Sequence, residues 1–417
     1  MSAGALIVGA SQAGLQLAVS LREQGYPDPI TLVGEEPHAP YQRPPLSKEF
    51  LTGTAGPETL AFRTPAFYRD AGIDLVCGEQ VTEVTLPSGA SATGLAGTAS
   101  GRELPFERLA LTVGASVRRL TVPGADLPGI CYLRGVDDAT LLRPQLTGAA
   151  RVVVVGGGFI GLEAAAVARS LGATVTVVEA TDRLIGRAVA PVVSEFYRAA
   201  HERRGTTVHT QTSVTGFRDA GGRVGGVLLA DGTELAADLV VVGVGVVPRT
   251  ELAEKLGLEC DGGIVVDARA RTSDPLVVAA GDCTVLPHPL TGEGRVRLES
   301  VNNAVSQATA AAAALVGAPD VGPNVPWFWS NQGDLRLQIA GLSAGFDEYV
   351  VRGVPESEKF SVLYYREGRL LAVDAVNSPS EYMVVRRALT QGATVPADRA
   401  GDVTTPLKQL LTELAAA

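Results

Sequence analysis

One local pattern occurs twice in this chain: a short apolar strand, a glycine-containing turn and a helix with apolar residues along one face. The first copy consists of the strand Ala5–Val8, the turn 9–14 and the helix that follows it. The second copy consists of the strand Arg151–Val155, the turn 156–161 and its own helix. Glycine allows the backbone to turn sharply between a buried strand and a helix. The duplication predicts an α/β fold with two Rossmann-like dinucleotide-binding domains.

An acidic residue follows the next apolar strand in each copy. The strand at 30–33 leads to Glu35, and the strand Thr174–Val178 leads to Glu179. Both acids lie about 20 residues after the last glycine of their turn, which is the distance expected for a carboxylate that binds an adenosine ribose. A single glycine turn is often only a tight connection. Two copies with correctly spaced acids favour two nucleotide sites.

The glycine turns themselves suit a pyrophosphate, because the first amide groups of a helix are unpaired donors at its positive end. The first copy keeps Gly9 and Gly14 and has Ser11 at the middle position, which departs from the pattern but is still small. The second copy keeps all three glycines: Gly156, Gly158 and Gly161. Both turns are therefore predicted to bind a dinucleotide.

The second acid bears on the choice of nicotinamide coenzyme. Glu179 would accept hydrogen bonds from the ribose hydroxyls and repel a 2′-phosphate, which favours NADH over NADPH. Arg183 and Arg187 lie just downstream and could accept a 2′-phosphate, which keeps NADPH as the alternative coenzyme.

Two dinucleotide sites in one chain suggest a tightly held flavin, FAD, and an exchangeable NADH, because a hydride must pass between two rings. A later apolar strand at 276–280 ends in Gly281 and Asp282. A carboxylate at the end of that strand would hold the ribityl hydroxyls of a flavin, although Gly-Asp alone is a common turn. The alanine-rich segment 300–316 is predicted to be a helix, and its amino end at Val301 would stabilise negative charge on the reduced ring.

The remaining chain predicts a segmented architecture. We expect a first part of the FAD-binding domain at 1–115, an NAD-binding domain at 116–245, a second part of the FAD-binding domain at 246–323 and a C-terminal α+β domain at 324–417. The glycine-rich stretch 218–238 indicates an antiparallel meander, and 239–247 reads as one long strand. Residues 318–324 are predicted to be a linker, followed by antiparallel strands within 327–342 and 360–375 and a helix at 380–389.

Composition excludes several classes of protein. The 417 residues carry 35 Lys and Arg against 45 Asp and Glu, a net charge of −10, which makes nucleic acid an unlikely partner. The four cysteines lie far apart without metal-ligand spacing, and no metal site is expected. The start has no basic region before its apolar strand, and no apolar run is long enough to span a bilayer. We expect a cytoplasmic protein without a membrane partner, as a monomer or weak dimer.

Five further segments occur in this order: 40–48 (PYQRPPLSK), 243–248 (GVGVVP), 279–283 (AAGDC), 299–301 (ESV) and 327–332 (WFWSNQ). Together they resemble the FAD-dependent, NADH-using ferredoxin reductases of bacterial oxygenase systems, which have a glutathione-reductase-like fold. The resemblance covers essentially the whole chain. It implies FAD contacts at Ala13, Glu35, Arg43, Lys48, Val81, Arg134, Gly281, Asp282, Val301 and Trp329. It implies NAD contacts at Ile160, Glu163, Glu179, Arg187 and Gly245.

The resemblance also implies three catalytic residues: Lys48, Glu163 and Trp329. Lys48 is expected to pair with Glu163 beside the flavin, where the pair would steer nicotinamide binding; a plain salt bridge between domains is the alternative. The segment with Arg43 and Lys48 would otherwise be a solvated loop, but its two prolines restrict the backbone and favour an ordered platform. Trp329 matches a tryptophan near the flavin, whereas Trp327 is equally compatible with core packing.

The implied reaction is hydride transfer from NADH to flavin, followed by release of single electrons to a small [2Fe-2S] ferredoxin that serves a monooxygenase or dioxygenase. No acid or base is required, and all four histidines are interpreted as structural. Such ferredoxins are acidic, so a net negative reductase needs a local basic patch. We hypothesise that this patch is formed by Arg63, Arg336, Arg386 and Arg387. The alternative is that these arginines are ordinary solvated surface residues.

Other acceptors remain open. A rubredoxin reductase, a monodehydroascorbate reductase or another NADH-dependent flavoprotein of the pyridine nucleotide-disulfide family would share both nucleotide sites. A disulfide reductase is disfavoured because no cysteine precedes Cys77. A redox signalling protein similar to apoptosis-inducing factor would need a basic surface and a targeting segment. The chain departs from the family pattern at two places: 112–115, where the family has an FAD contact, and Gly333, where the family often has an aromatic residue on the ferredoxin-facing surface.

Overall fold

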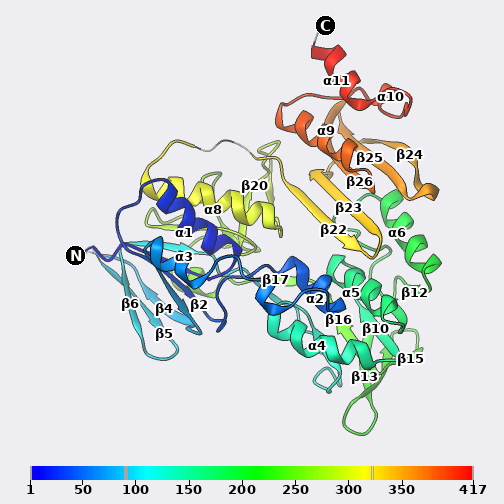
Figure 1. Cartoon of the computed structure of the whole chain (residues 1–417), viewed down its shortest axis with the longest axis horizontal. Coiled ribbons are helices and arrows are strands. Elements are labelled where there is room, and N and C mark those ends of the chain that lie inside the picture. Colours follow the sequence, from blue (N-terminus) through cyan, green and yellow to red (C-terminus); the bar gives the residue numbers. More distant parts are fainter. Residues whose placement is uncertain (1, 89–92, 321, 323, 416–417) are drawn as a thin grey trace. The chain divides into compact units, whose positions relative to one another are not determined.

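The computed structural model describes residues 2–88, 93–320, 322 and 324–415, with side chains to residue 411 (Figure 1). The chain folds into two compact units. The first unit consists of Met1–Gln42, Leu60–Ser116 and Val247–Pro326. The second consists of Arg43–Thr59, Val117–Val246 and Trp327–Ala417. The chain passes between the units in the short strands β8 (Ala115–Val117) and β17 (Val246–Pro248).

A five-stranded parallel sheet forms the centre of the first unit. Its strand order is β19-β7-β1-β2-β3, and every neighbouring pair is parallel. The strands are β1 (Ala5–Val8), β2 (Ile30–Gly34), β3 (Ile73–Cys77), β7 (Arg108–Leu111) and β19 (Val277–Ala279). Because all strands run in one direction, their carboxyl ends meet at one edge, where ligands bind in open α/β sheets.

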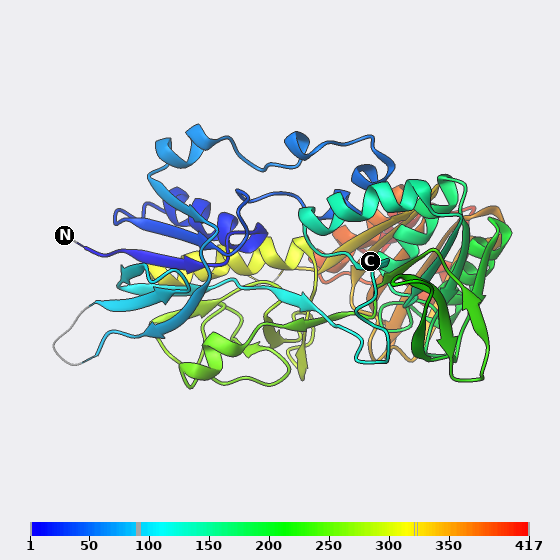
Figure 2. The same ribbon diagram turned by 90° about the horizontal axis from the view of Figure 1, so that it is seen from below.

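Both faces of this sheet are covered, which explains the unbroken apolar sequence of β1. Ala5 and Ile7 face the helices α1 (Gln12–Glu23) and α8 (Val301–Val316), which pack side by side in Figure 1. Leu6 and Val8 face an antiparallel sheet on the other side, seen in Figure 2. That sheet consists of β4 (Val81–Thr85), β5 (Gly94–Thr98) and β6 (Glu103–Phe106). The unit also contains α3 (Pro65–Asp70), α7 (Glu251–Lys255), β18 (Ile264–Val265), β20 (Thr284–Pro287) and β21 (Arg295–Val296).

The second unit repeats this plan around its own parallel sheet, in the order β12-β11-β10-β16-β9. The strands are β9 (Ile130–Tyr132), β10 (Arg151–Val155), β11 (Thr174–Val178), β12 (Thr206–His209) and β16 (Leu239–Val242). The unit's helices include α4 (Val136–Gly148), α5 (Phe159–Ser170) and α6 (Pro191–Arg203). The predicted meander is present as β13 (Val214–Asp219), β14 (Val224–Leu229) and β15 (Glu234–Ala236), and packs on β10 through Val153 and Val155.

One strand prediction is wrong. Residues 239–247 form β16, which ends at Val242, and the separate strand β17, which begins at Val246. Gly245 between them has a φ of 99°, a left-handed conformation that a continuous strand does not contain. Apolar content alone does not reveal this break, because valines flank it on both sides.

The C-terminal part of the second unit is an antiparallel sheet, as predicted, in the order β22-β23-β26-β25-β24. The strands are β22 (Trp327–Gln332), β23 (Leu335–Gly341), β24 (Glu348–Val354), β25 (Lys359–Arg366) and β26 (Arg369–Val376). The helix α9 (Pro379–Thr390) covers one face, and η3 (Pro355–Ser357), α10 (Ala397–Ala400) and α11 (Leu407–Ala415) complete this part. Of the predicted linker, Val321 and Pro323 lie outside the described residues.

The segment Arg43–Thr59 packs within the second unit as three short turns of helix: η1 (Pro44–Ser47), α2 (Glu49–Thr52) and η2 (Pro57–Thr59). Pro44 and Pro45 open η1, where a missing amide proton costs nothing. Within the described parts of the chain, no helix has both the length and the apolarity needed to cross a bilayer.

Candidate dinucleotide and ion-pair sites

The first glycine turn is held by contacts that leave no room for a side chain. Gly9 has a φ of 115°, and a Cβ placed there would lie 2.2 Å from the carbonyl oxygen of Thr112. A Cβ at Gly14 would lie 2.0 Å from the carbonyl oxygen of Gly9. The Thr112 hydroxyl donates to the carbonyls of Val8 and Gly9, so it supports the turn. Ser11 is the N-cap residue of α1, at the carboxyl end of β1.

The second turn contains two glycines in tight packing contacts and one glycine with open space beside it. A Cβ at Gly156 would lie 2.4 Å from the Gly243 carbonyl oxygen, and one at Gly161 would lie 2.2 Å from the Gly156 carbonyl oxygen. At Gly158 the nearest atom would be 3.9 Å away, so the protein itself leaves space there. Close helix packing and close approach of a pyrophosphate are the two reasons for glycines in such a turn. The residues present therefore fit a dinucleotide.

The two predicted ribose acids are both held by the protein. Glu179 follows β11 and accepts hydrogen bonds from the Gly157 amide at 2.7 Å and the Thr181 amide at 2.8 Å. Those contacts aim the carboxylate at the glycine turn. Glu35 follows β2 and forms an ion pair with Arg249, a partner that sequence reasoning did not identify. The ion pair spans more than 200 residues, so no local pattern indicates it.

The two arginines downstream of Glu179 have different surroundings. The Arg183 guanidinium donates to the carbonyls of Gly186 and Val189, both at 2.7 Å. The Arg183 guanidinium therefore forms these hydrogen bonds within its own loop. Arg187 is exposed, and its guanidinium lies 3.6 Å from the position that a Cβ of Gly245 would occupy. The predicted NAD contacts Arg187 and Gly245 thus lie close together.

The Gly281 turn is held by a polar residue of another element, which the sequence analysis missed. Gln307, on α8, accepts through Oε1 from the Gly281 amide at 2.8 Å and from the Thr284 hydroxyl at 2.9 Å. Its Nε2 is buried and has no hydrogen-bond partner among the described residues. A Cβ at Gly281 would lie 3.2 Å from that of Ala13, so the turn lies against α1. An unpaired buried donor beside this turn suits a ligand oxygen.

Other predicted FAD contacts are placed as follows. Val81 is a buried residue of β4, and Val301 is the first residue of α8, whose N-cap Ser300 accepts from the Asn303 amide. In the second unit, Arg43 donates to the Arg134 carbonyl at 2.9 Å, so these two predicted residues are in contact.

The expected ion pair between Lys48 and Glu163 is present in the second unit, with 2.7 Å between Nζ and Oε2. It is largely removed from solvent, with side-chain exposures of 13% for Lys48 and 2% for Glu163. Ser47 also donates to Oε2, at 2.5 Å, and Ser330 donates to Oε1, at 2.7 Å. Both serines are missing from the sequence prediction. Their hydroxyls satisfy a carboxylate that would be costly to bury otherwise.

Aromatic side chains of β22 divide between its two faces. Trp327 and Trp329 stack with ring centroids 5.5 Å apart, and Arg386 lies over Trp327 at 4.9 Å. Trp327 also packs against the core beneath α9. Phe328, on the opposite face, packs on Phe159 of α5 at 4.6 Å. The next residue, Ile160, is a predicted NAD contact with an unusually exposed apolar side chain.

The proposed basic patch contains exposed arginines. Arg336 and Arg387 are exposed on the C-terminal part of the second unit, while Arg63 belongs to the first unit and lies over Phe67. Gly333 occupies the turn between β22 and β23 with a φ of 64°, a left-handed conformation that favours glycine.

The described residues contain no group of three or more His, Cys, Asp or Glu side chains placed to hold a metal ion. All four cysteines are free thiols. Burial raises the pKa of the Cys283 thiol to about 12, which keeps it protonated and unreactive.

Two parallel-sheet domains with glycine turns, the acids Glu35 and Glu179 after their second strands, and a buried Lys-Glu pair define a two-nucleotide flavoprotein oxidoreductase. The family model described as pyridine nucleotide-disulphide oxidoreductase matches residues 4–308, and the model described as reductase C-terminal matches 327–411. The chain belongs to this pyridine nucleotide-disulphide oxidoreductase family, in its ferredoxin reductase branch.

Similar proteins match over nearly full length. Rhodocoxin reductase of Rhodococcus erythropolis is 44% identical over 97% of this chain and 93% of its own. A rubredoxin-NAD(+) reductase of Pseudomonas putida is 38% identical over 90% of this chain and 96% of its own. The reductase in a covalent putidaredoxin reductase-putidaredoxin complex superposes with a TM-score of 0.94, at 39% identity and 99% coverage of both chains.

Proposed function

We propose that this protein is an FAD-containing reductase that passes electrons from NADH, one at a time, to a [2Fe-2S] ferredoxin serving a monooxygenase or dioxygenase. The observation that carries the proposal is the buried Lys48–Glu163 pair in a chain with two glycine-turn nucleotide domains. Related disulfide reductases use a cysteine pair near the flavin, whereas the four cysteines here are separate free thiols.

The coenzymes are assigned to residues as predicted. In the first unit, FAD would be held by Gly9, Ser11, Ala13, Gly14, Glu35, Val81, Gly281, Asp282 and Val301. In the second unit, its proposed contacts are Arg43, Lys48, Arg134 and Trp329. NADH would be held by Gly156, Gly158, Ile160, Gly161, Glu163, Glu179, Arg187 and Gly245. We also propose the four-segment domain division given above, with boundaries at 115, 245 and 323.

Bound FAD supplies an acceptor for the hydride of NADH and a donor of single electrons. The chain's own residues would orient the coenzymes and set the electrostatic potential around them. The positive end of α8 favours negative charge near Val301. The Lys48 ammonium provides a positive charge fixed by Glu163, and Trp329 offers an aromatic face for a planar ring.

NADH is the proposed reductant rather than NADPH. A 2′-phosphate would meet the Glu179 carboxylate, which the Gly157 and Thr181 amides hold in place. Arg183 would have to give up two backbone carbonyls to bind that phosphate. Arg187 is the remaining cation of the loop that could reach a phosphate.

A rubredoxin is the second candidate acceptor, because a rubredoxin-NAD(+) reductase is among the similar proteins. Reduction of a ferredoxin and of a rubredoxin would use the same nucleotide sites and differ only in the docking surface. The identity of the acceptor therefore depends on the docking surface rather than on the nucleotide domains.

The test is NADH-driven reduction of a panel of [2Fe-2S] ferredoxins and rubredoxins by the purified protein, repeated with NADPH. We expect bound FAD in the isolated protein, a preference for NADH and clearly faster reduction of at least one ferredoxin than of any rubredoxin. A colourless protein that takes up no FAD would contradict the proposal. Reduction of rubredoxins alone would support the second candidate.

A further inference from the structure

A continuous row of buried hydrogen bonds leads away from the Lys48–Glu163 pair. The Glu163 Oε1 accepts from the Ser330 hydroxyl at 2.7 Å. The Ser330 oxygen accepts from Gln332 Nε2 at 3.3 Å. Gln332 Oε1 is 2.8 Å from His201 Nε2. All four of Glu163, Ser330, Gln332 and His201 are buried.

The donors in this row point one way. The Ser330 hydroxyl gives its proton to the carboxylate, so it accepts from the amide of Gln332. The Gln332 carbonyl oxygen is then free to accept, and His201 must carry its proton on Nε2. Burial lowers the pKa of His201, in keeping with a neutral ring. Each group therefore donates toward the Glu163 carboxylate, and such aligned bonds strengthen one another.

Strand alternation explains how one segment supplies two members of the row. Successive side chains of β22 point to opposite faces, so Phe328, Ser330 and Gln332 share a face. Phe328 fixes that face against α5 through Phe159. Glu163 lies on α5, one turn beyond Phe159, and meets Ser330 there.

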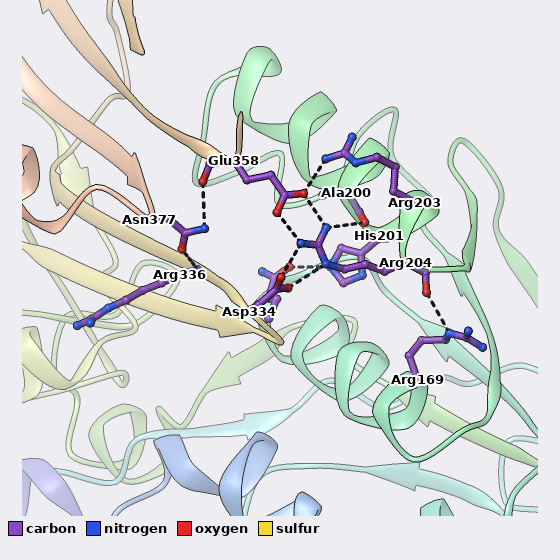
Figure 3. A network of polar contacts seen from close by, with 10 residues as sticks. Arg169, Ala200, His201, Arg203, Arg204, Asp334, Arg336, Glu358 and Asn377 are labelled. Carbon is purple, nitrogen blue, oxygen red and sulfur yellow. Dashed lines mark hydrogen bonds and ion pairs between the residues drawn. The ribbon is translucent and has the colours of Figure 1, made fainter. Parts of the chain in front are cut away.

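An ion-pair cluster beside His201 fixes the other end of the row. Arg204, three residues after His201, forms ion pairs with Asp334 at 2.9 Å and Glu358 at 2.6 Å (Figure 3). Asp334 lies in the turn between β22 and β23, only two residues after Gln332. The end of α6 is therefore tied to the turn that follows Gln332, and Figure 3 shows Arg204 between Asp334 and Glu358.

We propose that Ser330, Gln332 and His201 are positioning residues that hold the Glu163 carboxylate, and through it the Lys48 ammonium, in one orientation. The inference rests on the proposed function, in which Lys48 and Glu163 act beside the flavin. It gives the C-terminal part of the chain a role in the chemistry of NADH oxidation, in addition to any role in contact with the electron acceptor.

The substitution Ser330→Ala should weaken the effect of Lys48 on the flavin. Ser330→Ala removes the hydrogen bond to Oε1 and leaves the carboxylate more effectively negative, so more of the Lys48 field is cancelled. We expect the rate constant of flavin reduction by NADH to fall by about tenfold or more. We also expect the midpoint potential of the bound flavin to become more negative, with a small change in the KM for NADH.

The matched control is Ser361→Ala. Ser361 is also fully buried in the C-terminal sheet and also donates to a carboxylate, Glu381 Oε2, at 2.6 Å. It lies outside the row to Glu163. Ser361→Ala should lower stability without changing the flavin potential or the rate of its reduction. FAD content and thermal unfolding of both variants are measured to show that each is folded.

A double-mutant cycle tests whether Ser330 acts through Glu163. In the Glu163→Gln background, Ser330→Ala should change the reduction rate and potential by much less than in the unmodified protein. Gln332→Leu and His201→Phe should shift the potential in the same direction as Ser330→Ala, by smaller amounts. Equal potentials and reduction rates in Ser330→Ala and Ser361→Ala would overturn the inference, as would an undiminished Ser330 effect in the Glu163→Gln background.

These outcomes are distinct from failure of the proposed function. If the unmodified protein binds no FAD, or bound FAD is not reduced by NADH, the proposed function fails. If the unmodified protein behaves as proposed but Ser330→Ala changes neither the flavin potential nor the rate of flavin reduction, the proposed function stands. The positioning role of Ser330, Gln332 and His201 is then rejected.

Discussion

Buried ionisable side chains in the second unit have unequal numbers of partners. Glu163 accepts from Lys48, Ser47 and Ser330, and Arg352 donates to Glu381 and three backbone carbonyls. Asp374 is completely buried, and its Oδ2 accepts from the Tyr364 hydroxyl. Its Oδ1 has no partner within the described part of the chain. Burial raises the pKa of Asp374 to about 7.

The raised pKa predicts how stability depends on pH. In the range from about pH 4 to pH 7 the folded state keeps a proton on Asp374 that the unfolded state has lost. Stability should therefore fall as pH rises through this range, by up to about 1.4 kcal/mol per pH unit, and level off above it. Asp374→Asn cannot titrate, so its stability relative to the unmodified protein should increase with pH.

Denaturant unfolding at several pH values, with excess FAD, measures this difference. Comparing the two proteins isolates Asp374, because buried His201, whose pKa is lowered, contributes the opposite pH dependence equally to both. Parallel stability curves for the two proteins between pH 4 and pH 7 would contradict the prediction.

Among the elements, α8 connects sequence pattern to site most directly. Its alanine-rich face packs on α1, and its first turn is capped by Ser300, whose side chain accepts from the Asn303 amide at 3.0 Å. Gly317, at its C-cap, has a φ of 70° and ends the helix. Both signals are local, which is why the helix boundaries agree with the sequence prediction. Gln307 on the same helix was missed because its partners, Gly281 and Thr284, come from another segment.

Removal of this cap gives a prediction at the same scale. Ser300→Ala should lower the free energy of unfolding by about 1 kcal/mol, because one amide of the first turn loses its acceptor. Ser300→Thr keeps a hydroxyl in place and should lose clearly less. Urea unfolding of the three proteins is the measurement, and equal losses in both variants would show that the cap is not the cause.

At the scale of the whole molecule, the net charge of −10 would repel the acidic ferredoxin that we propose as the partner. Association would then depend on local positive charge rather than on the overall balance. Arg336 and Arg387 are exposed on the C-terminal part of the second unit, and the side chain of Arg336 points away from the Arg204 cluster in Figure 3.

Charge reversal tests this arrangement. Arg336→Glu with Arg387→Glu should slow ferredoxin reduction at low salt by about tenfold or more, and the difference should shrink as ionic strength rises. Reduction of ferricyanide should be unchanged. Arg223→Glu is the control, because Arg223 is exposed on the second unit but lies in the turn between β13 and β14 of the meander. Unchanged ferredoxin rates in the double variant at low salt would reject the patch.

Local chemistry within a few residues was sufficient to predict both nucleotide domains. The glycine spacing, the apolar strands and the positions of Glu35 and Glu179 are patterns among residues that lie close together in the sequence. Steric limits on the backbone also act between residues that are close in the sequence. The break at Gly245 escaped prediction because valine is compatible with a strand on either side of it. The expected Lys48–Glu163 contact came from family resemblance and not from any local signal.

Only the tertiary structure decided which groups surround that pair. Ser330 lies 167 residues from Glu163 along the chain, and His201 lies 131 residues from Gln332. A hydroxyl or an amide can form hydrogen bonds with many kinds of partner, and the residues next to it in the sequence do not determine which partner it meets. The choice follows from which faces of β22, α5 and α6 pack together, because a buried carboxylate must be satisfied by whatever donors that packing brings within reach.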